Sequence, residues 1–181
     1  MLCAVYIIHL RGDAALEIRV NYKNEDSIIL MSKFLKNYIS PRTLILCIGT
    51  DKWIGDSLGP FVGYFLKKNH YPGPVYGTLE NPVHAINLYN TLKEIKKRHP
   101  HSNMIAVDAC LGDPIHVGKV VLTNNPLYPG KGVGKALPAV GDVSIVGIVD
   151  EYNSYNLHNI RLDLIVNMAE MICRGIINSV K

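Results

Sequence analysis

The chain has 181 residues, of which 48% are apolar and 19% are charged. This length suits a single domain spanning residues 1–181, and the apolar content excludes a disordered chain. The net charge of +4 is spread thinly apart from the run 96–98, so nucleic acid is not expected as a partner. The four cysteines lie far apart, which excludes a Cys-x-x-Cys zinc site and fits a reducing cytoplasm.

Predicted strands and helices alternate along the chain. The opening segment, residues 1–10, is apolar but short and lacks a basic leader, so we expect a strand rather than a signal peptide or a membrane segment. Further strands are predicted over residues 15–22, 43–49, 75–79, 104–108, 117–123 and 143–149, and helices over residues 26–41, 57–69, 84–98 and 156–176.

This alternation predicts an α/β protein. Residues 1–42 supply an N-terminal strand and helix, and residues 43–181 form the core of the same domain. The Gly- and Pro-rich stretch 124–142 is expected to be a long irregular loop, of the kind that is usually functional or mobile. The expected architecture is a three-layer α/β/α sandwich with a twisted, mostly parallel sheet and helices on both faces.

Two aspartates follow predicted strands. Asp56 lies in the loop after residues 43–49, and Asp108 closes the apolar strand that begins at Met104. Parallel strands end at the same edge of a sheet, so both carboxylates are expected in one crevice. Two carboxylates that share a proton can act as general base on water and as general acid on a leaving group, which suits amide hydrolysis. The alternative for Asp56 is a structural one, because an acid before Ser57 can cap a helix.

The same carboxylates could instead bind a metal. Candidate additional ligands are present, but no pair of them has a diagnostic spacing, so no metal or cofactor is expected. These candidates are His84, His116, His158, Glu80 and Asp142. A phosphate-binding loop is not expected in the Gly-rich run 130–136, because Pro129 replaces its first glycine and Ala136 replaces its Ser/Thr.

Several segments resemble the YyaC family of sporulation proteins, which is related to the spore germination protease. The resemblance spans most of residues 44–150. It rests on Cys-Ile-Gly-Thr-Asp at 47–51, Gly-Asp-Ser-Leu-Gly-Pro at 55–60, Gly-Thr-Leu-Glu-Asn-Pro-Val-His-Ala-Ile-Asn-Leu at 77–88, Val-Asp-Ala-Cys-Leu-Gly at 107–112, Pro-Leu-Tyr-Pro-Gly-Lys-Gly-Val-Gly-Lys at 126–135 and Leu-Pro-Ala-Val-Gly-Asp at 137–142.

The resemblance implies a phosphorylase/hydrolase-like fold and an aspartic-type endopeptidase of sporulation or germination. By this resemblance Asp56 and Asp108 are the catalytic pair. The hydrogenase-maturation endopeptidases share the general fold, but no histidine here matches the one with which they recognise nickel. Residues expected to shape the substrate groove are Asp51, Trp53, Glu80, His84, Gly130, Lys131 and Gly132.

The implied partner is a protein or peptide substrate, with spore proteins as candidates, in the cytoplasm of the spore or sporulating cell. A homo-oligomer is compatible with this interpretation. One alternative is a non-catalytic sporulation protein that keeps a protease-like pocket for peptide or protein binding, suggested by the chain's small size and the lack of a recognisable propeptide. A second alternative is a metal-dependent hydrolase.

Overall fold

A computed structural model describes residues 16–129, 137–152 and 160–180. Within these residues six strands form one sheet in the order β1-β5-β6-β4-β2-β3. The strands are β1 (Glu17–Asn21), β2 (Leu44–Cys47), β3 (Val75–Tyr76), β4 (Met104–Gly112), β5 (Lys119–Thr123) and β6 (Val143–Glu151). The helices are α1 (Asp26–Leu35), α2 (Leu58–Lys68), α3 (Leu88–Arg98) and α4 (Leu162–Val180), with short 3₁₀ turns η1 (Ile54–Ser57) and η2 (Pro114–His116).

The sheet is mostly parallel, as the sequence predicts. β3, β2, β4 and β6 run in the same direction, whereas β5 is antiparallel to both β6 and β1. The chain passes from β4 to β5 through the short turn η2, without the crossover helix that a parallel connection requires. The reversal of β5 therefore follows from the length of its connection.

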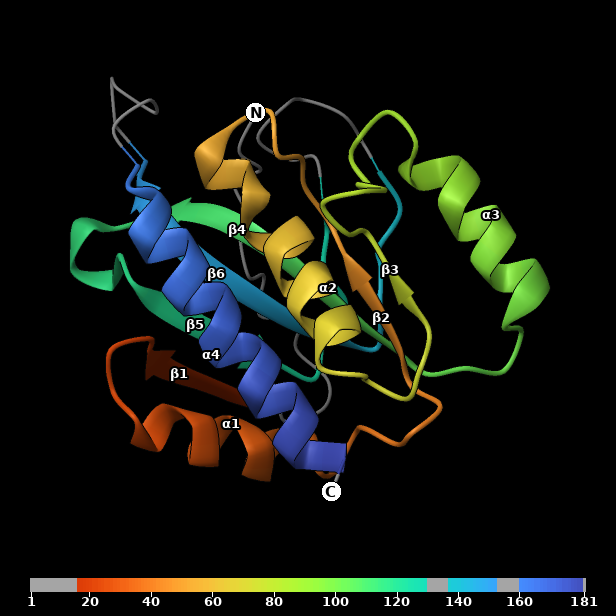
Figure 1. Cartoon of the computed structure of the whole chain (residues 1–181), viewed down its shortest axis with the longest axis horizontal. Helices are drawn as coiled ribbons and strands as arrows, with labels where there is room; N and C mark the ends of the chain where they lie inside the picture. Colours follow the sequence, from red (N-terminus) through yellow and green to blue (C-terminus); the bar gives the residue numbers. More distant parts are fainter. Residues whose placement is uncertain (1–15, 130–136, 153–159, 181) are drawn as a thin grey trace.

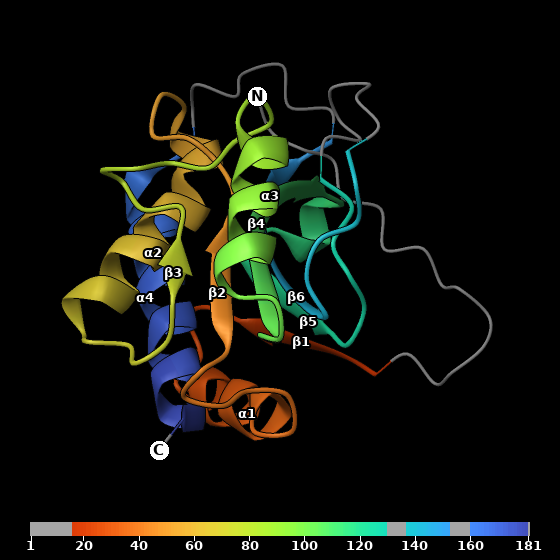
Figure 2. The ribbon, with the colours of Figure 1, turned by 90° about the vertical axis from the view of Figure 1, so that its right-hand side faces the viewer.

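Helices cover the two faces of the sheet unequally. Figures 1 and 2 show α1, α2 and α4 together on one face and α3 alone on the other. The first core joins the sheet to α1, α2 and α4. The second core joins it to α3 and to the segments around Val83, Leu127 and Val140. These layers confirm the expected three-layer α/β/α arrangement. In the described part of the chain, no helix is long and apolar enough to span a bilayer.

Several element boundaries differ from those that the sequence predicts. β4 continues four residues beyond Asp108 to Gly112, so this aspartate lies inside a strand rather than at its end. β3 has only two residues, because Gly77 adopts a φ of 80° that ends the extended run. α3 begins at Leu88 instead of His84, and α4 reaches Val180. The predicted first strand, residues 1–10, lies outside the described residues.

Glycines let α2 pack directly on the sheet. Gly59 and Gly63 are four residues apart and thus share one face of the helix. A Cβ atom at Gly59 would overlap the Ile48 carbonyl oxygen, and one at Gly63 would overlap the Gly77 carbonyl oxygen. This close contact fixes the start of α2, and with it η1, against the ends of β2 and β3.

Candidate functional site

Asp108 lies in the middle of the sheet. Its neighbour Val107 pairs with Cys47, the last residue of β2, so Asp108 comes one position beyond the point where β2 ends. On its other side it is paired with Val146 of β6. Strand residues alternate between the faces of a sheet, so Asp108 shares the α3-side face with Ala106 and Cys110.

The Asp108 carboxyl group is buried and only half satisfied. The residue is 1% exposed. Its Oδ1 accepts a hydrogen bond of 2.8 Å from the Ala109 backbone N–H, whereas Oδ2 has no partner within the described residues. Burial raises the pKa of Asp108 well above its usual value, and the nearby charge of Asp56 raises this pKa further. Burial therefore favours the protonated form of this group, which can donate a proton.

The loop between β2 and α2 holds Asp56. The Thr50 N–H donates to the Asp56 carbonyl oxygen at 3.0 Å, and the Asp56 N–H donates to the Trp53 carbonyl oxygen at 3.0 Å. Gly49 has a φ of 138°, and a Cβ atom there would overlap the Asp56 carbonyl oxygen. A glycine is thus required at the position where this loop folds back on β2.

Asp56 differs from Asp108 in its protonation. The residue is 8% exposed. Burial raises the pKa of Asp56 from the usual 3.8 to about 6, and a hydrogen bond from the Thr50 backbone limits this rise. Asp56 is therefore largely ionised near neutral pH, whereas burial favours the protonated form of Asp108. A base and an acid close enough to influence each other's pKa are the kind of pair that hydrolysis of an amide requires.

The capping alternative for Asp56 receives little support from the geometry. Ser57 is the N-cap residue of α2, and no side-chain hydrogen bond caps that helix. The Ser57 hydroxyl instead donates to the Ile54 carbonyl oxygen at 2.5 Å. Asp56 lies one residue further back, inside η1.

Glu80 and His84 lie beside a groove at the edge of the sheet. Val83 reaches the site, because its carbonyl oxygen accepts a 2.8 Å hydrogen bond from the Gly49 N–H. Next to it, the His84 backbone N–H donates to the Asn87 side chain at 2.8 Å. Glu80 and His84 line a groove of about 950 Å³ between α2, β3 and α3, and neither Asp56 nor Asp108 lines it. This groove and the aspartate pair are thus separate features.

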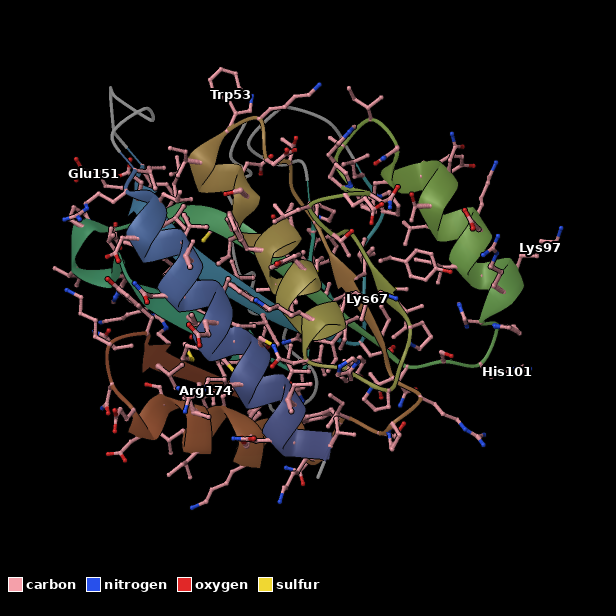
Figure 3. All side chains as sticks on the ribbon, in the orientation of Figure 1. Trp53, Lys67, Lys97, His101, Glu151 and Arg174 are labelled. Carbon is pink, nitrogen blue, oxygen red and sulfur yellow. The ribbon has the colours of Figure 1, made fainter. Side chains whose placement is uncertain are left out.

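The remaining predicted groove residues lie apart from that groove. Asp51 and Trp53 are exposed in the loop before η1, with Trp53 half exposed, and Figure 3 shows Trp53 projecting from the molecule above α2. Neither residue lines the groove. Gly130, Lys131 and Gly132 fall outside the described residues.

The candidate metal ligands do not gather around the aspartates. Asp142 exchanges hydrogen bonds with the backbone of Met104 at the start of β4, the opposite end from the site. His116 lies between the side chains of Arg19 and Lys119, at 3.3 and 3.1 Å. In the described ranges no three His, Cys, Asp or Glu side chains are grouped as metal ligands would be. His158 lies outside those ranges.

The sequence did not indicate one wall of the groove. Tyr64, Lys67 and Lys68 of α2 line it, opposite Thr91 and Glu94 of α3. The only signal was their spacing, because residues three and four apart lie on one side of a helix. A polar stripe of this kind is also what any solvent-facing helix surface carries.

Comparison with known proteins gives two matches. The family described as "Protein of unknown function (DUF1256)" matches residues 19–175. The "Uncharacterized protein YyaC" of Bacillus subtilis (strain 168) is 41% identical over 177 residues, which cover 94% of this chain and 81% of that protein. The range matched by the family, residues 19–175, spans the positions of both aspartates.

Proposed function

This chain belongs to the DUF1256 family, and we propose that it is a peptide hydrolase in which Asp56 and Asp108 activate water against a peptide bond. The observation that carries the proposal is the Asp108 Oδ2 atom, which is buried without a hydrogen-bond partner in the described residues. Leaving a buried polar atom unpaired costs about 1–3 kcal/mol. Local energetic costs of this kind cluster at functional sites, and here the unpaired atom lies near a second buried carboxyl group.

The two protonation states assign the roles. The Asp56 carboxylate accepts a proton from water as the water oxygen attacks the carbonyl carbon of the peptide bond. Asp108 donates its proton to the amide nitrogen, the C–N bond breaks, and a carboxylic acid and an amine are released. Proton transfer from Asp56 to Asp108 then restores the starting state.

The resemblance to the germination protease supports the reaction and suggests its setting. By this resemblance, Asp56 in segment 55–60 and Asp108 in segment 107–112 take the places of the two catalytic aspartates of that atypical aspartic endopeptidase. We therefore place the protein in the cytoplasm of the spore or sporulating cell, with a spore protein as its substrate. Sporulation and proteolysis are parts of the proposal.

New amino termini provide the test. A spore-protein extract is incubated with wild-type protein, with Asp56→Asn and with Asp108→Asn, each with and without chelator, and new termini are labelled and sequenced. The wild type is expected to cleave, and chelator should have no effect. In each variant the cleavage rate should fall at least 100-fold, because a general acid and a general base each contribute on this scale. The exposed Asp26→Asn in α1 is the matched control and should cleave normally.

The other outcomes separate the alternatives. Cleavage that persists in both aspartate variants would overturn the proposal, and cleavage abolished by chelator would favour the metal-dependent hydrolase. A non-catalytic module that binds a peptide or protein is the second candidate function, favoured by the groove of about 950 Å³ away from the aspartates. It predicts binding without new termini.

A further inference from the structure

The groove beside β3 occupies the position of a further strand. β3 is the last strand of the sheet, and α2 and α3 stand on opposite faces of it (Figure 2). The groove is lined by β3 itself and by residues of both helices. Its volume of about 950 Å³ falls within the range of ligand sites. The open space is thus bounded above and below by helices and on one side by a strand edge.

The backbone of Val75 is directed into this space. In a pair of parallel strands, a residue of one strand forms backbone hydrogen bonds to the two residues that flank its partner on the other strand. Ile45 of β2 is the residue that forms such bonds, and its partner on β3 is Val75. The Ile45 N–H bond of 2.9 Å to the Pro74 carbonyl oxygen confirms this register. The N–H and C=O of Val75 therefore face away from β2, toward the groove that Val75 lines.

The groove also carries two lysines at one end, and the Lys68 Nζ lies 5.9 Å from the centroid of the Tyr64 ring. Lys67 and Lys68 line it from the last turn of α2, and Figure 3 shows Lys67 beside β3. No carboxylate in the described residues lies within ion-pair distance of either lysine. Glu94 on the opposite wall is already paired with Arg98 at 3.0 Å. Glu80 lies past the end of β3, toward the start of α3, so the groove has a basic end and an acidic end.

We propose that this groove binds an extended peptide segment that adds to β3 as the seventh strand of the sheet, with an acidic side chain opposite Lys67 and Lys68. Backbone hydrogen bonds to Val75 give the affinity, and the lysine pair gives the preference for acidic sequences. The choice of a peptide as the occupant rests on the proposed function, whereas the position and mode of binding rest on the sheet edge.

Charge reversal tests the preference. The first probe is a fluorescein-labelled heptapeptide of alternating valine and glutamate, and the second is the same peptide with lysine in place of glutamate. Fluorescence anisotropy measures the binding of each probe to the full chain. Lys67→Glu with Lys68→Glu should weaken binding of the glutamate peptide about tenfold or more and strengthen binding of the lysine peptide. Lys96→Glu with Lys97→Glu is the matched control, also an adjacent pair in the last turn of an eleven-residue helix, but outside the groove.

A backbone-modified peptide tests the mode. N-methylation of every valine blocks one edge of the extended peptide, and N-methylation of every glutamate in a second peptide blocks the other edge, while the charges remain. Strand addition predicts that one of these two peptides fails to bind. Binding of both methylated peptides equal to that of the parent peptide would overturn strand addition. Equal effects of the two lysine-pair reversals, or no binding of either heptapeptide by the wild type, would overturn the site.

The result stays separable from that of the hydrolase test. The double variant Asp56→Asn with Asp108→Asn should bind the glutamate peptide as the wild type does, because neither aspartate lines the groove. Binding that survives in a protein unable to cleave contradicts only the hydrolase proposal. Cleavage that is unaffected by reversing Lys67 and Lys68 contradicts only the groove proposal.

Discussion

Asp56 and Asp108 make the folded protein hold protons more tightly than the unfolded chain does. Each has a higher pKa when folded, because burial disfavours its charged form. A group of this kind stabilises the protein fully at low pH, and the stabilisation is lost as the pH rises through its folded pKa. For Asp56 the loss falls between a pH near 4 and a pH somewhat above 6. The candidate site is therefore a source of instability at neutral pH.

Replacing Asp56 by Asn should accordingly stabilise the protein in a pH-dependent manner. The rise of the pKa from 3.8 to about 6 corresponds to about 2–3 kcal/mol above pH 7. The measurement is the free energy of unfolding in urea at pH 4 and at pH 7.5. Between these pH values the stability of Asp56→Asn relative to the wild type should increase by about 2–3 kcal/mol. Asp26→Asn, on the exposed start of α1, should show no such change. A difference that is equal at the two pH values would contradict the buried-charge account.

The pH dependence of hydrolysis should report the same two groups. Because Asp56 must be ionised, kcat/KM should rise with pH around an apparent pKa of about 6. It should fall again where Asp108, whose pKa is raised further by its complete burial, loses its proton. Initial rates on a cleaved peptide from pH 4.5 to 9, with circular dichroism at each pH to confirm folding, provide the measurement. A flat profile between pH 5 and 7 would assign the base role elsewhere.

The sequence located these aspartates but not their environment. An acid after an apolar run indicated Asp108 as a residue at a strand end, and a protonatable site was inferred from that position. In the structure β4 continues to Gly112, and Asp108 is buried inside the sheet, between β2 and β6. The burial depends on which strands become neighbours, and no local pattern around Asp108 specifies that.

The close packing of α2 on the sheet determines where Asp56 lies. Gly59 and Gly63 bring the helix backbone against the ends of β2 and β3, and η1 with Asp56 directly precedes this helix. Side chains larger than hydrogen at these positions would push α2 outward. The geometry of the aspartate pair thus depends on a helix–sheet distance that two glycines set.

Gly63→Ala should destabilise the protein although alanine is the better helix former. The new methyl group would meet the Gly77 carbonyl oxygen, part of a backbone that cannot move aside, so we expect a loss of about 1–3 kcal/mol in the free energy of unfolding. Gly175→Ala in α4 is the matched control, because there the methyl group would meet the flexible side chain of Met31. Urea denaturation should therefore rank Gly63→Ala as clearly the less stable variant. The opposite order would show that α2 can shift at little cost.

Helical periodicity predicted where the helices are better than where they begin and end. The apolar pattern of α3 suggested a start at His84, but residues 84–87 are held in a turn by the hydrogen bond from the His84 N–H to the Asn87 side chain. Side-chain to backbone bonds of this kind compete with helix formation. Similarly, β3 was predicted to reach residue 79, but the Gly77 backbone conformation ends it three residues earlier, at Tyr76.

At the scale of the molecule, the fold separates two features along one sheet. Asp108 lies in β4, which stands between β2 and β6, and Asp56 lies in η1, whereas the groove is lined by β3 at the edge of the sheet. Figure 1 shows β4 inside the sheet and β3 at its edge. The alternation of strands and helices predicted the layers, because it depends on local pattern. The groove was not predictable in this way, since its walls come from α2 and α3 and its floor from β3, and only the folded sheet brings them together.

Hydrogen exchange should distinguish the open edge from the closed centre. Val75 is only 9% exposed, so the burial of its side chain alone would suggest a protected amide. Its N–H nevertheless points away from β2, and the parallel register leaves this N–H without a strand partner. We therefore expect the Val75 amide to exchange fast, whereas the amides of β4 and β6 should exchange only on global unfolding. Adding the valine/glutamate heptapeptide should slow Val75 specifically, because the peptide supplies the missing carbonyl acceptor. Slow exchange of Val75 in the free protein would mean that its N–H is already bonded within the chain, and the edge could not accept a seventh strand.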